Sequence, residues 1–413
     1  MTTTDPSRAI RVAVLVAALG YFVDIYDLLL FSIVRIPSLQ SLGYDGEELK
    51  RVGLYLIDMQ MFGMLIGGIL WGVLGDKRGR LSVLFGSIFL YSIANIANGT
   101  VESVEAYAVW RFIAGIGLAG ELGAGITLVA EIMPKEKRGL GTMMVAVVGL
   151  TGAILAGVLA KVFDWRTCYF IGGGLGLCLL LLRIGVRESG MFEQTARKDN
   201  VSRGNFFVLF TNKERLLRYL RCIFIGLPTW YVIGILVTFS PEFAIALGVP
   251  TVEGANINAG NAVMLAYAGL VAGDLASGLL SQALRSRIRV MAFFIFLGMI
   301  GSLIFLNARG VTQSTLYALC FLLGFAVGYW VLFVTVAAEQ FGTNLRATVT
   351  TTVPNFVRGA LVLITASFRV AETHLGILDG AMVVGCACFL ISIFFLIGMK
   401  ETFHRDMDFV EEV

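Results

Sequence analysis

Long apolar runs recur along almost the whole chain, and each is long enough to cross a lipid bilayer as a helix. The hydrocarbon core of a bilayer takes about 20 predominantly apolar residues in helical form. Only 15% of the 413 residues are charged, whereas soluble globular domains carry about 25%. A transmembrane β-barrel would instead show short segments of alternating polarity. The sequence therefore predicts an all-α membrane protein with twelve spans, at about residues 10–34, 52–74, 81–99, 105–131, 140–162, 166–186, 219–242, 258–283, 289–308, 313–337, 347–369 and 376–399.

The widest polar gap, at about residues 187–217, divides the spans into two sets of six. It contains several basic residues, and basic loops stay on the cytoplasmic side of a membrane. The other basic loops fall on the same side when loops are counted outward from this gap. We therefore expect a multi-pass protein of the cell (inner) membrane with both termini in the cytoplasm. Its expected parts are an N-terminal six-helix bundle (1–186), a cytoplasmic linker (187–217) with Arg187, Arg197, Lys198, Arg203, Lys213 and Arg215, and a C-terminal six-helix bundle (218–413).

The two halves repeat each other in sequence. "AEIMPKEKRG" at 130–139 and "AEQFGTNLRA" at 338–347 each place an arginine seven residues after a glutamate, and the two glutamates are 208 positions apart. "RES" at 187–189 and "KET" at 400–402 repeat at a nearly equal offset of 213. Each match follows an equivalent span, which indicates duplication of a six-helix unit. Internal repeats are typical of transporters, whose substrate site lies between the repeats near the bilayer midplane.

The loop after the second span, "GVLGDKRGR" at 72–80, resembles the loop 2–3 signature of the major facilitator superfamily, G-x-x-x-D-x-x-G-[RK]. A basic cytoplasmic loop alone would explain its lysine and arginines but not the spacing of its glycines and aspartate. The two Glu–Arg repeats resemble loops 4–5 and 10–11 of that superfamily. The resemblance covers essentially the whole chain and implies two bundles that rock against each other, with loop charges forming a cytoplasmic gate. The implied gating residues are Gly72, Asp76, Gly79, Arg80, Glu131, Arg138, Glu339 and Arg346.

The second-half counterpart of this loop, "GLLSQALRSR" at 278–287, departs from the signature. It carries Gln282 where the superfamily pattern has an aspartate. The sequence therefore leaves open whether a matching latch exists in loop 8–9.

The fourth span contains "GIGLAG" at 115–120, which fits the dinucleotide fingerprint G-x-G-x-x-G. That fingerprint needs a preceding strand and a helix N-terminus aimed at a pyrophosphate. Here it lies inside a membrane span, so we interpret its glycines as contacts that let helices pack closely. The longer stretch 111–131 resembles the span-4 pattern R-x-x-x-G of the superfamily. Within it, Gly120-Glu121-Leu122-Gly123 is similar to the metabolite:proton symporter branch.

The first span, with "YFVDIYDLLLF" at 21–31, holds two aspartates in an apolar setting. A single carboxylate at the bilayer centre costs about 2.5 to 3.5 kcal/mol. Asp24 and Asp27 share one helix face, and burial and mutual repulsion both favour holding a proton near neutral pH. "DIYDL" resembles the span-1 element of metabolite:proton and aromatic-acid:proton symporters. We expect Asp24, Asp27 and Glu121 to couple transport to protons; the alternative is that the aspartates cap a loop or pair with Arg111.

Arg358 lies near the middle of the eleventh span, beside Pro354 and Asn355. A side chain so far from the span ends cannot reach the interface, so it either binds a substrate anion or pairs with an acid. Depth along straight helices makes Glu121 and Asp274 the nearest acids. Aromatic residues on spans 1, 7 and 10 fall where this superfamily has its central cavity. The candidate substrate-binding residues are Arg111, Arg358, Asn355, Tyr26, Trp230, Tyr231 and Tyr329, with Trp330 beside the last.

These features indicate a secondary transporter that moves a small organic anion, a carboxylate, together with protons by alternating access. The alternative is a symporter or facilitator of a neutral sugar or polyol, which only Gln60, Asn261 and Asn355 favour. The sequence offers no nucleophile–base pair, phosphate loop or metal-ligand cluster, so we expect no enzyme activity, no cofactor and no metal. The expected partners are a small-molecule substrate, protons and the bilayer, with no nucleic acid, and we expect a monomer.

Overall fold

Twelve helical spans in the described part of the chain are long and apolar enough to cross a membrane, which confirms the predicted fold class. The computed structural model describes residues 6–133, 138–183, 203–252, 256–403, 405 and 408–411, without the side chains of 6–10, 138 and 139. The predicted linker residues 187–202 and the side chain of Arg138 lie outside this description. The first two spans extend to Ser41 and to Arg78, beyond their predicted ends, because polar residues continue a helix past its apolar run.

Six spans build each half of the molecule. The first half comprises α1 (Pro6–Ser41), α2 (Gly46–Arg78), α3 (Arg80–Asn98), α4 (Val104–Leu118), α5 (Glu121–Ile132), α6 (Arg138–Leu150), α7 (Gly152–Val162) and α8 (Trp165–Leu182). The second half comprises α10 (Val208–Thr211), α11 (Lys213–Phe224), α12 (Leu227–Tyr231), the π-helix η1 (Val232–Val237), α13 (Ser240–Ala246), α14 (Ala259–Leu284), α15 (Arg287–Leu306), α16 (Gln313–Ala326), α17 (Trp330–Gln340), α18 (Arg346–Gly359), α19 (Leu361–Leu375) and α20 (Ile377–Ile397).

Several predicted spans are interrupted within the membrane. The fourth span breaks at Ala119 and Gly120 between α4 and α5, and the tenth breaks at residues 327–329 between α16 and α17. Non-helical backbone at membrane depth is tolerated only where protein covers it, and both breaks are buried. The sequence patterns predicted each of these spans as one uninterrupted stretch, because hydropathy does not register a local change of backbone hydrogen bonding.

Close helix packing repeats at equivalent places in the two halves. A Cβ on Gly115 would lie 2.2 Å from the carbonyl oxygen of Gln60, where α4 packs on α2. A Cβ on Gly324 would lie 1.8 Å from the carbonyl oxygen of Ala266, where α16 packs on α14. Small residues let membrane helices approach this closely. The glycine-rich stretch of the fourth span therefore serves helix packing, and the two halves share one packing plan.

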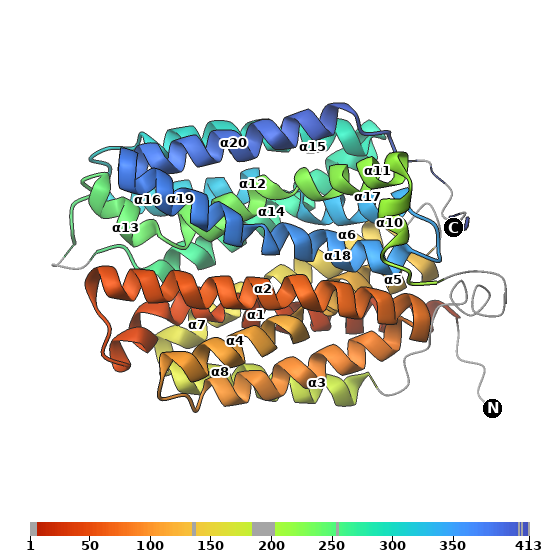
Figure 1. Cartoon of the computed structure of the whole chain (residues 1–413), viewed down its shortest axis with the longest axis horizontal. Helices are drawn as coiled ribbons and strands as arrows, with labels where there is room; N and C mark the ends of the chain where they lie inside the picture. Colours follow the sequence, from red (N-terminus) through yellow and green to blue (C-terminus); the bar gives the residue numbers. More distant parts are fainter. Residues whose placement is uncertain are drawn as a thin grey trace.

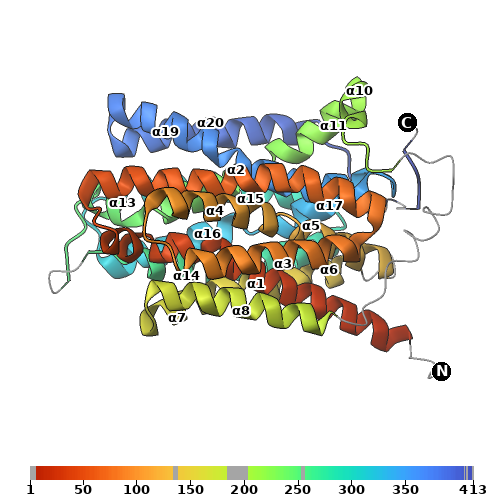
Figure 2. The same ribbon diagram turned by 60° about the horizontal axis from the view of Figure 1, so that its bottom comes forward.

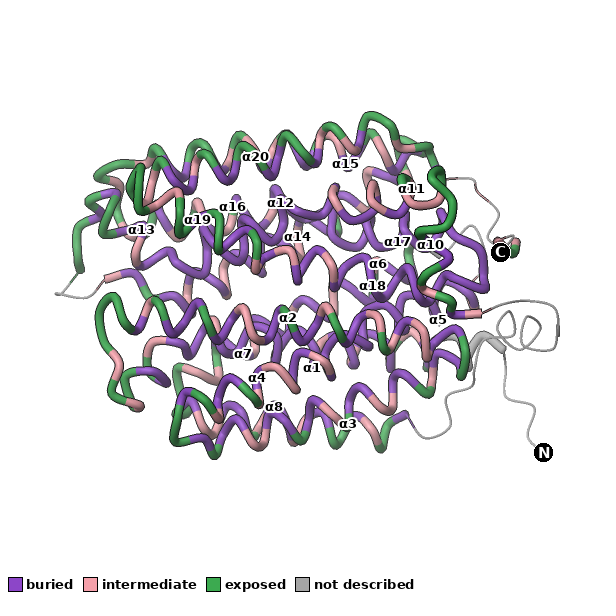
Figure 3. The backbone as a smooth tube through the Cα atoms, viewed as in Figure 1, coloured by how far each residue is buried: buried purple, intermediate pink, exposed green. Residues whose placement is uncertain are grey.

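The helices run along the long axis of the molecule (Figure 1), and α1 begins at the same end where residues 408–411 lie (Figures 1 and 2). We call this end the terminal face and the other end the opposite face. The halves meet where α2 packs on α18, α5 on α18, and α1 and α6 on α14. Exposed residues are frequent along α3, α8, α15 and α20, whereas α5, α12, α17 and α18 are almost wholly buried (Figure 3). Exposed apolar side chains on those outer helices, such as Phe293 and Phe394, fit a lipid-facing surface.

Candidate functional site

A small closed cavity lies between the two halves. It has free space for about one water molecule, and its walls are largely apolar and aromatic. The first half contributes Tyr21, Ile25 and Leu150, and the second half contributes Thr229, Trp230, Ile233, Tyr267, Leu270, Trp330 and Arg358. The π-helix η1 supplies Ile233, and π-helical turns often mark functional sites. The cavity therefore joins one cation to several aromatic rings at the boundary where the halves must move.

Arg358 is the charged residue of this cavity, and its side chain is almost fully buried. Its Cζ lies 5.9 Å from the ring centroid of Trp230 and 5.7 Å from that of Trp330. Its Nη2 lies 4.0 Å from Oδ2 of Asp24 in the other half, and its Nη1 donates to Asn355 at 3.2 Å. The Nε atom makes no hydrogen bond within the described residues. The guanidinium thus faces two aromatic rings and one carboxylate beyond hydrogen-bond distance. Its Nε–H group remains able to donate a hydrogen bond.

The prediction that Glu121 and Asp274 are the acids nearest to Arg358 is wrong. Glu121 forms an ion pair with Arg183, and Asp274 accepts a backbone N–H on α17. Asp24 is the acid that Arg358 meets. Depth along straight helices could not find this pair, because it gives the level of a residue in the membrane but not the direction of its side chain.

Asp24 and Asp27 are both fully buried on α1. Their carboxylate oxygens accept no hydrogen bond within the described part of the structure. Asp27 lies near Arg111 and Asn95, and a Cβ on Gly172 would come 2.2 Å from its Oδ1. The glycine on α8 therefore leaves space for this carboxylate. Two adjacent buried carboxylates without fixed donors can take up and release protons without breaking a hydrogen-bond network.

Arg111 is buried in the first half, on α4. It donates a hydrogen bond to the side-chain oxygen of Gln60, and its Cζ lies 4.6 Å from the ring centroid of Phe31. Its Nε and Nη1 make no hydrogen bond within the described residues, where it also has no carboxylate within ion-pair distance. Arg111 does not line the central cavity. It lies near Asp27 and supplies positive charge on that side of the aspartate pair.

Glu121, the third residue predicted for proton coupling, has both carboxylate oxygens occupied. Arg183 of α8's C-terminal end donates to Oε2 at 2.7 Å and to Oε1 at 3.1 Å, and Ser87 donates to Oε1 at 2.9 Å. All three residues are buried. The sequence analysis missed Arg183, although its place inside the predicted span 166–186 was a signal that it needed a partner. Glu121 thus differs from the aspartates, whose oxygens are unoccupied.

The other candidates for substrate binding are mostly engaged in packing. Three tyrosine hydroxyls donate to backbone carbonyls: Tyr26 to Cys168 at 2.9 Å, Tyr231 to Ala381 at 2.7 Å, and Tyr329 to Ile225 at 2.9 Å. Asn355 uses its Nδ2 on the carbonyls of Ala119 and Thr351, both at 2.7 Å. Of the aromatic residues named from the sequence, Trp230 and Trp330 line the cavity. It also includes Tyr21 and Tyr267, which the sequence analysis did not name, although Tyr21 lies one helical turn before Asp24.

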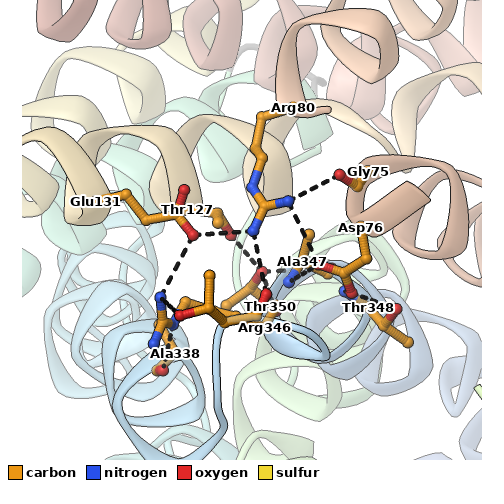
Figure 4. Close-up of polar contacts among 11 residues, drawn as sticks. Gly75, Asp76, Arg80, Thr127, Glu131, Ala338, Arg346, Ala347, Thr348 and Thr350 are labelled. Atoms are coloured by element: carbon orange, nitrogen blue, oxygen red, sulfur yellow. Dashed lines mark hydrogen bonds and ion pairs between the residues drawn. The ribbon is translucent and has the colours of Figure 1, made fainter. Parts of the chain in front are cut away.

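Asp76 joins the two halves at the terminal face (Figure 4). Its Oδ1 accepts the N–H of Ala347 at 3.1 Å, and its Oδ2 accepts the N–H and hydroxyl of Thr348 at 2.8 and 2.7 Å. These donors belong to the first turn of α18, whose N–H groups have no partner within their own helix. A Cβ on Gly72 would lie 3.0 Å from the Cα of Thr348, so this glycine permits the close approach. The loop 2–3 aspartate therefore caps a helix of the other half.

Glu131 lies between two arginines from different halves (Figure 4). Its Oε1 accepts from Nη2 of Arg80 at 2.9 Å and from Nη1 of Arg346 at 3.3 Å. Arg80 also donates to the carbonyl of Gly75 at 2.9 Å. The repeat spacing had paired Glu131 with Arg138 and Glu339 with Arg346. The structure pairs Glu131 crosswise with Arg346, since the repeats meet across the boundary of the halves.

A related cluster in the second half holds Glu339. Arg287 approaches its Oε1 at 3.3 Å, and Thr402 donates to its Oε2 at 2.7 Å. Glu401, after the last helix, accepts the N–H of Arg287 at 2.9 Å and the hydroxyl of Ser286 at 2.5 Å. Although partial burial raises the pKa of Glu401, these and other hydrogen bonds lower it below its usual range. A carboxylate from the C-terminal segment thus lies at loop 8–9, where Gln282 replaces the signature aspartate.

Ion pairs between the halves also close the opposite face. Nη2 of Arg35 lies 2.8 Å from Oε1 of Glu242, joining α1 to α13. Nζ of Lys50 lies 2.5 Å from Oε1 of Glu372, joining α2 to α19. The Arg35 side chain is fully buried. Because contacts between the halves exist at both faces, the central cavity is closed on both sides. The sequence analysis missed these pairs, since no repeat or motif marks them.

Comparison with known proteins agrees with this architecture. Residues 16–366 match the pattern of the Major Facilitator Superfamily. The chain is 32% identical over 186 residues to the "Putative metabolite transport protein" of Haemophilus influenzae, a match covering 44% of this chain and 45% of that protein. It is 25% identical to the "Putative niacin/nicotinamide transporter NiaP" of Bacillus subtilis over 83% of this chain and 84% of that protein.

Among solved structures, the proton:xylose symporter XylE bound to 6-bromo-6-deoxy-D-glucose has the same fold. The TM-score is 0.75 with 17% sequence identity, and the match covers 98% of each chain. An identity this low reports the fold alone. The family match, however, spans most of the chain. The structure agrees with it, since two six-span halves enclose a central cavity. The chain therefore belongs to the Major Facilitator Superfamily and is a multi-pass membrane transporter.

Proposed function

We propose that the protein is a proton-coupled symporter of a small organic anion, a carboxylate attached to a flat apolar body. The observation that carries this proposal is the position of Arg358 in the central cavity, between Trp230 and Trp330 and 4.0 Å from Asp24. A guanidinium binds a carboxylate through two parallel hydrogen bonds. The neighbouring indole rings would cover an apolar ring or chain attached to that carboxylate.

Competition for Arg358 provides the coupling to protons. While Asp24 is ionised, it partly neutralises the guanidinium and disfavours a second anion beside it. Protonation of Asp24 removes that charge, so the substrate carboxylate takes its place. Asp27 lies one helical turn away, beside Arg111. It passes the proton between Asp24 and whichever face of the protein is open to water. Glu121, held by Arg183, supports the fourth span at its break.

Alternating access follows from the contacts at the two faces. We assign the terminal face to the cytoplasm, because its loops carry the basic residues. The network of Asp76, Arg80, Glu131 and Arg346 is then the cytoplasmic gate, joined by the Arg287–Glu339 cluster. Opening one face requires breaking its contacts between the halves while those at the other face hold.

The names of relatives support a carboxylate more than a sugar. The Bacillus subtilis relative is named for niacin and nicotinamide, which are aromatic ring compounds, and niacin is a carboxylic acid. The walls of the cavity offer aromatic rings and one arginine but few amide side chains. A site for a neutral sugar would need several amide or carboxylate groups for its hydroxyls. Gln60 and Asn355 do not line this cavity, and Asn355 donates to two backbone carbonyls.

Uptake into proteoliposomes tests the proposal. Purified protein is reconstituted, and uptake of labelled nicotinate, benzoate and xylose is measured with and without an inwardly directed proton gradient. We expect an aromatic carboxylate to accumulate above its external concentration only when the gradient is present. Accumulation of xylose but neither carboxylate, or carboxylate uptake that ignores the gradient, would contradict the proposal.

A further inference from the structure

The carboxylate of Asp274 lies at the break in the tenth span. α16 ends at Ala326 and α17 begins at Trp330. The first N–H groups of a helix have no partner in that helix, and inside a membrane no bulk water serves them. Asp274 on α14 is 2% exposed. Its Oδ1 accepts the N–H of Val331 at 3.2 Å, and the N–H of Trp330 also faces this carboxylate.

A direct contact between two backbones brings Asp274 to this position. A Cβ on Gly328, in the break, would lie 2.5 Å from the Cα of Gly273 on α14. Only glycines allow the two chains to approach so closely. Asp274 follows Gly273 directly, so its short side chain reaches the start of α17. The glycine pair and the aspartate together fix where the second part of the tenth span begins.

The helix that starts here connects the cavity with the terminal face. Its first residue, Trp330, lines the central cavity, and the centroid of its ring lies 5.7 Å from Cζ of Arg358. Glu339, nine residues later, approaches Arg287 at 3.3 Å in the cluster at the terminal face. At 1.5 Å per residue these positions are about 13.5 Å apart along the helix. A shift of the first turn of α17 therefore moves a wall of the substrate cavity.

Asp274 also lies at the boundary that moves during transport. Its Oδ2 makes no hydrogen bond within the described residues. Asp274 lines a small cavity together with Thr142 of the first half and Thr335 of α17. Thr335 and Thr142 are 3.4 Å apart across this boundary. The carboxylate is thus placed to hold α17 against α14 while the first half moves past it.

Resting on the proposed function, we propose that Asp274 is a positioning residue of the substrate site. It accepts the N–H groups of the first turn of α17 and so holds the Trp330 ring beside Arg358, where the flat apolar part of a carboxylate substrate binds. It acts through Trp330 and does not touch the substrate. An acceptor at this position is required, whereas the negative charge is not.

Hydrogen–deuterium exchange of the purified full chain tests the helix contact without any substrate. Asp274→Ala should speed exchange of the amides of residues 330–332 at least about tenfold, because the N–H groups of Trp330 and Val331 lose their acceptor and residue 332 lies in the same turn. Asp274→Asn keeps an acceptor oxygen and should stay within about threefold of the parent. Ser277→Ala, which removes a hydroxyl one turn away on α14 that donates to the Asp274 carbonyl at 3.1 Å, should leave residues 330–332 unchanged. The first turn of α5, at residues 121–124, is the internal reference.

Unchanged exchange in the alanine variant would overturn the proposal, and so would equal acceleration in the alanine and asparagine variants. If the alanine variant does not elute as a single species, Asp274→Ser replaces it, since its shorter hydroxyl does not reach the N–H groups. Benzoate and nicotinate binding provides the second measurement. The dissociation constant should rise at least about tenfold in Asp274→Ala and stay within about threefold in Asp274→Asn.

The two measurements separate this inference from the proposed function. If the parent protein binds neither carboxylate, the proposed substrate class fails, and the exchange experiment still decides whether Asp274 holds α17. If the parent binds one of them and exchange responds as expected, an unchanged dissociation constant in Asp274→Ala overturns the link from α17 to the substrate site.

Discussion

Asp24 and Arg358 face each other across the boundary between the two halves, with Oδ2 and Nη2 4.0 Å apart. This separation exceeds a normal hydrogen bond, so each group attracts the other without being fixed to it. A carboxylate that approached the guanidinium directly would bind at a shorter distance. The relationship makes Arg358 the first residue to test.

Arg358→Lys should raise the dissociation constant for a bound aromatic carboxylate more than tenfold, a loss of over about 1.4 kcal/mol. Lysine keeps the charge but loses the planar pair of donors and the stacking on indole rings. Binding of benzoate or nicotinate to purified protein is the measurement. Arg369→Lys, on a half-exposed arginine of α19 paired with Asp58 at 3.7 Å, is the matched control and should bind normally. An affinity of Arg358→Lys within twofold of the parent would exclude the anion-binding role.

Asp27→Asn should abolish uphill accumulation but spare exchange of substrate down its gradient. Asparagine fits the space left by Gly172 but carries no titratable proton, so the variant cycles without coupling. Accumulation under an imposed pH gradient and counterflow without one are compared in the same proteoliposomes. Asp58→Asn, at a partly exposed carboxylate that accepts from Thr365 at 2.9 Å, should still accumulate substrate. Concentrative uptake by Asp27→Asn would remove Asp27 from the coupling pathway.

Neutralising Glu131 and Glu339 together should favour the conformation that is open at the terminal face. The change removes the carboxylate that Arg346 shares with Arg80 and the one that Arg287 approaches, while Asp76 stays 3.5 Å from Arg80. Removing one partner of a buried ion pair costs about 3 to 5 kcal/mol. A cysteine replacing Leu150, which lines the cavity, reports access to a membrane-impermeant maleimide from each side. Labelling from the terminal face should rise and labelling from the opposite face should fall.

The matched control for this pair is Glu48→Gln, on an exposed glutamate near the start of α2 that pairs with Arg51. It should leave labelling from both sides unchanged. The prediction fails if the double variant is labelled from the opposite face as fast as the parent or faster. The two glutamates would then not hold the terminal face closed.

Glu242→Gln should have the reverse effect and favour opening at the opposite face. The buried Arg35 would lose the carboxylate 2.8 Å away and keep an uncompensated charge, which costs about 3 to 5 kcal/mol. The same cysteine at position 150 should then label faster from the opposite face. Replacing both partners, Arg35→Gln with Glu242→Gln, should restore part of the difference, because no unpaired charge remains. Additive effects of the two single changes would show that the pair does not act as a latch.

The sequence predicted the spans and the internal repeat, because apolar length and motif spacing are properties of the chain itself. It also named most of the residues that meet at the terminal face. It did not predict which of them pair: Glu131 meets Arg346 across the boundary, and spacing along one half contains no information about the other half. The Arg35–Glu242 pair was missed for the same reason. Arg183 was missed although its place inside a predicted span indicated that it needed a partner, which is Glu121 of the same half.

Backbone breaks were a second source of error. The role of Asp274 depends on an interruption of the tenth span that hydropathy does not reveal, since residues 327–329 are as apolar as their neighbours. The tyrosines show a further limit. Tyr26, Tyr231 and Tyr329 lie on spans close to the cavity, but their hydroxyls are used on backbone carbonyls, and only side-chain direction separates them from Trp230 and Trp330.

The contact of Asp76 with the first turn of α18 has a consequence for how this chain can change. Two of its three donors are backbone N–H groups, which every residue except proline supplies. Replacements at positions 347 and 348 therefore leave most of the contact in place, provided they are small enough for Gly72 to approach. A replacement at position 76 by a residue without an acceptor oxygen removes all three hydrogen bonds at once. The tolerance to mutation at this joint is one-sided: the second half can vary in sequence while the first half cannot.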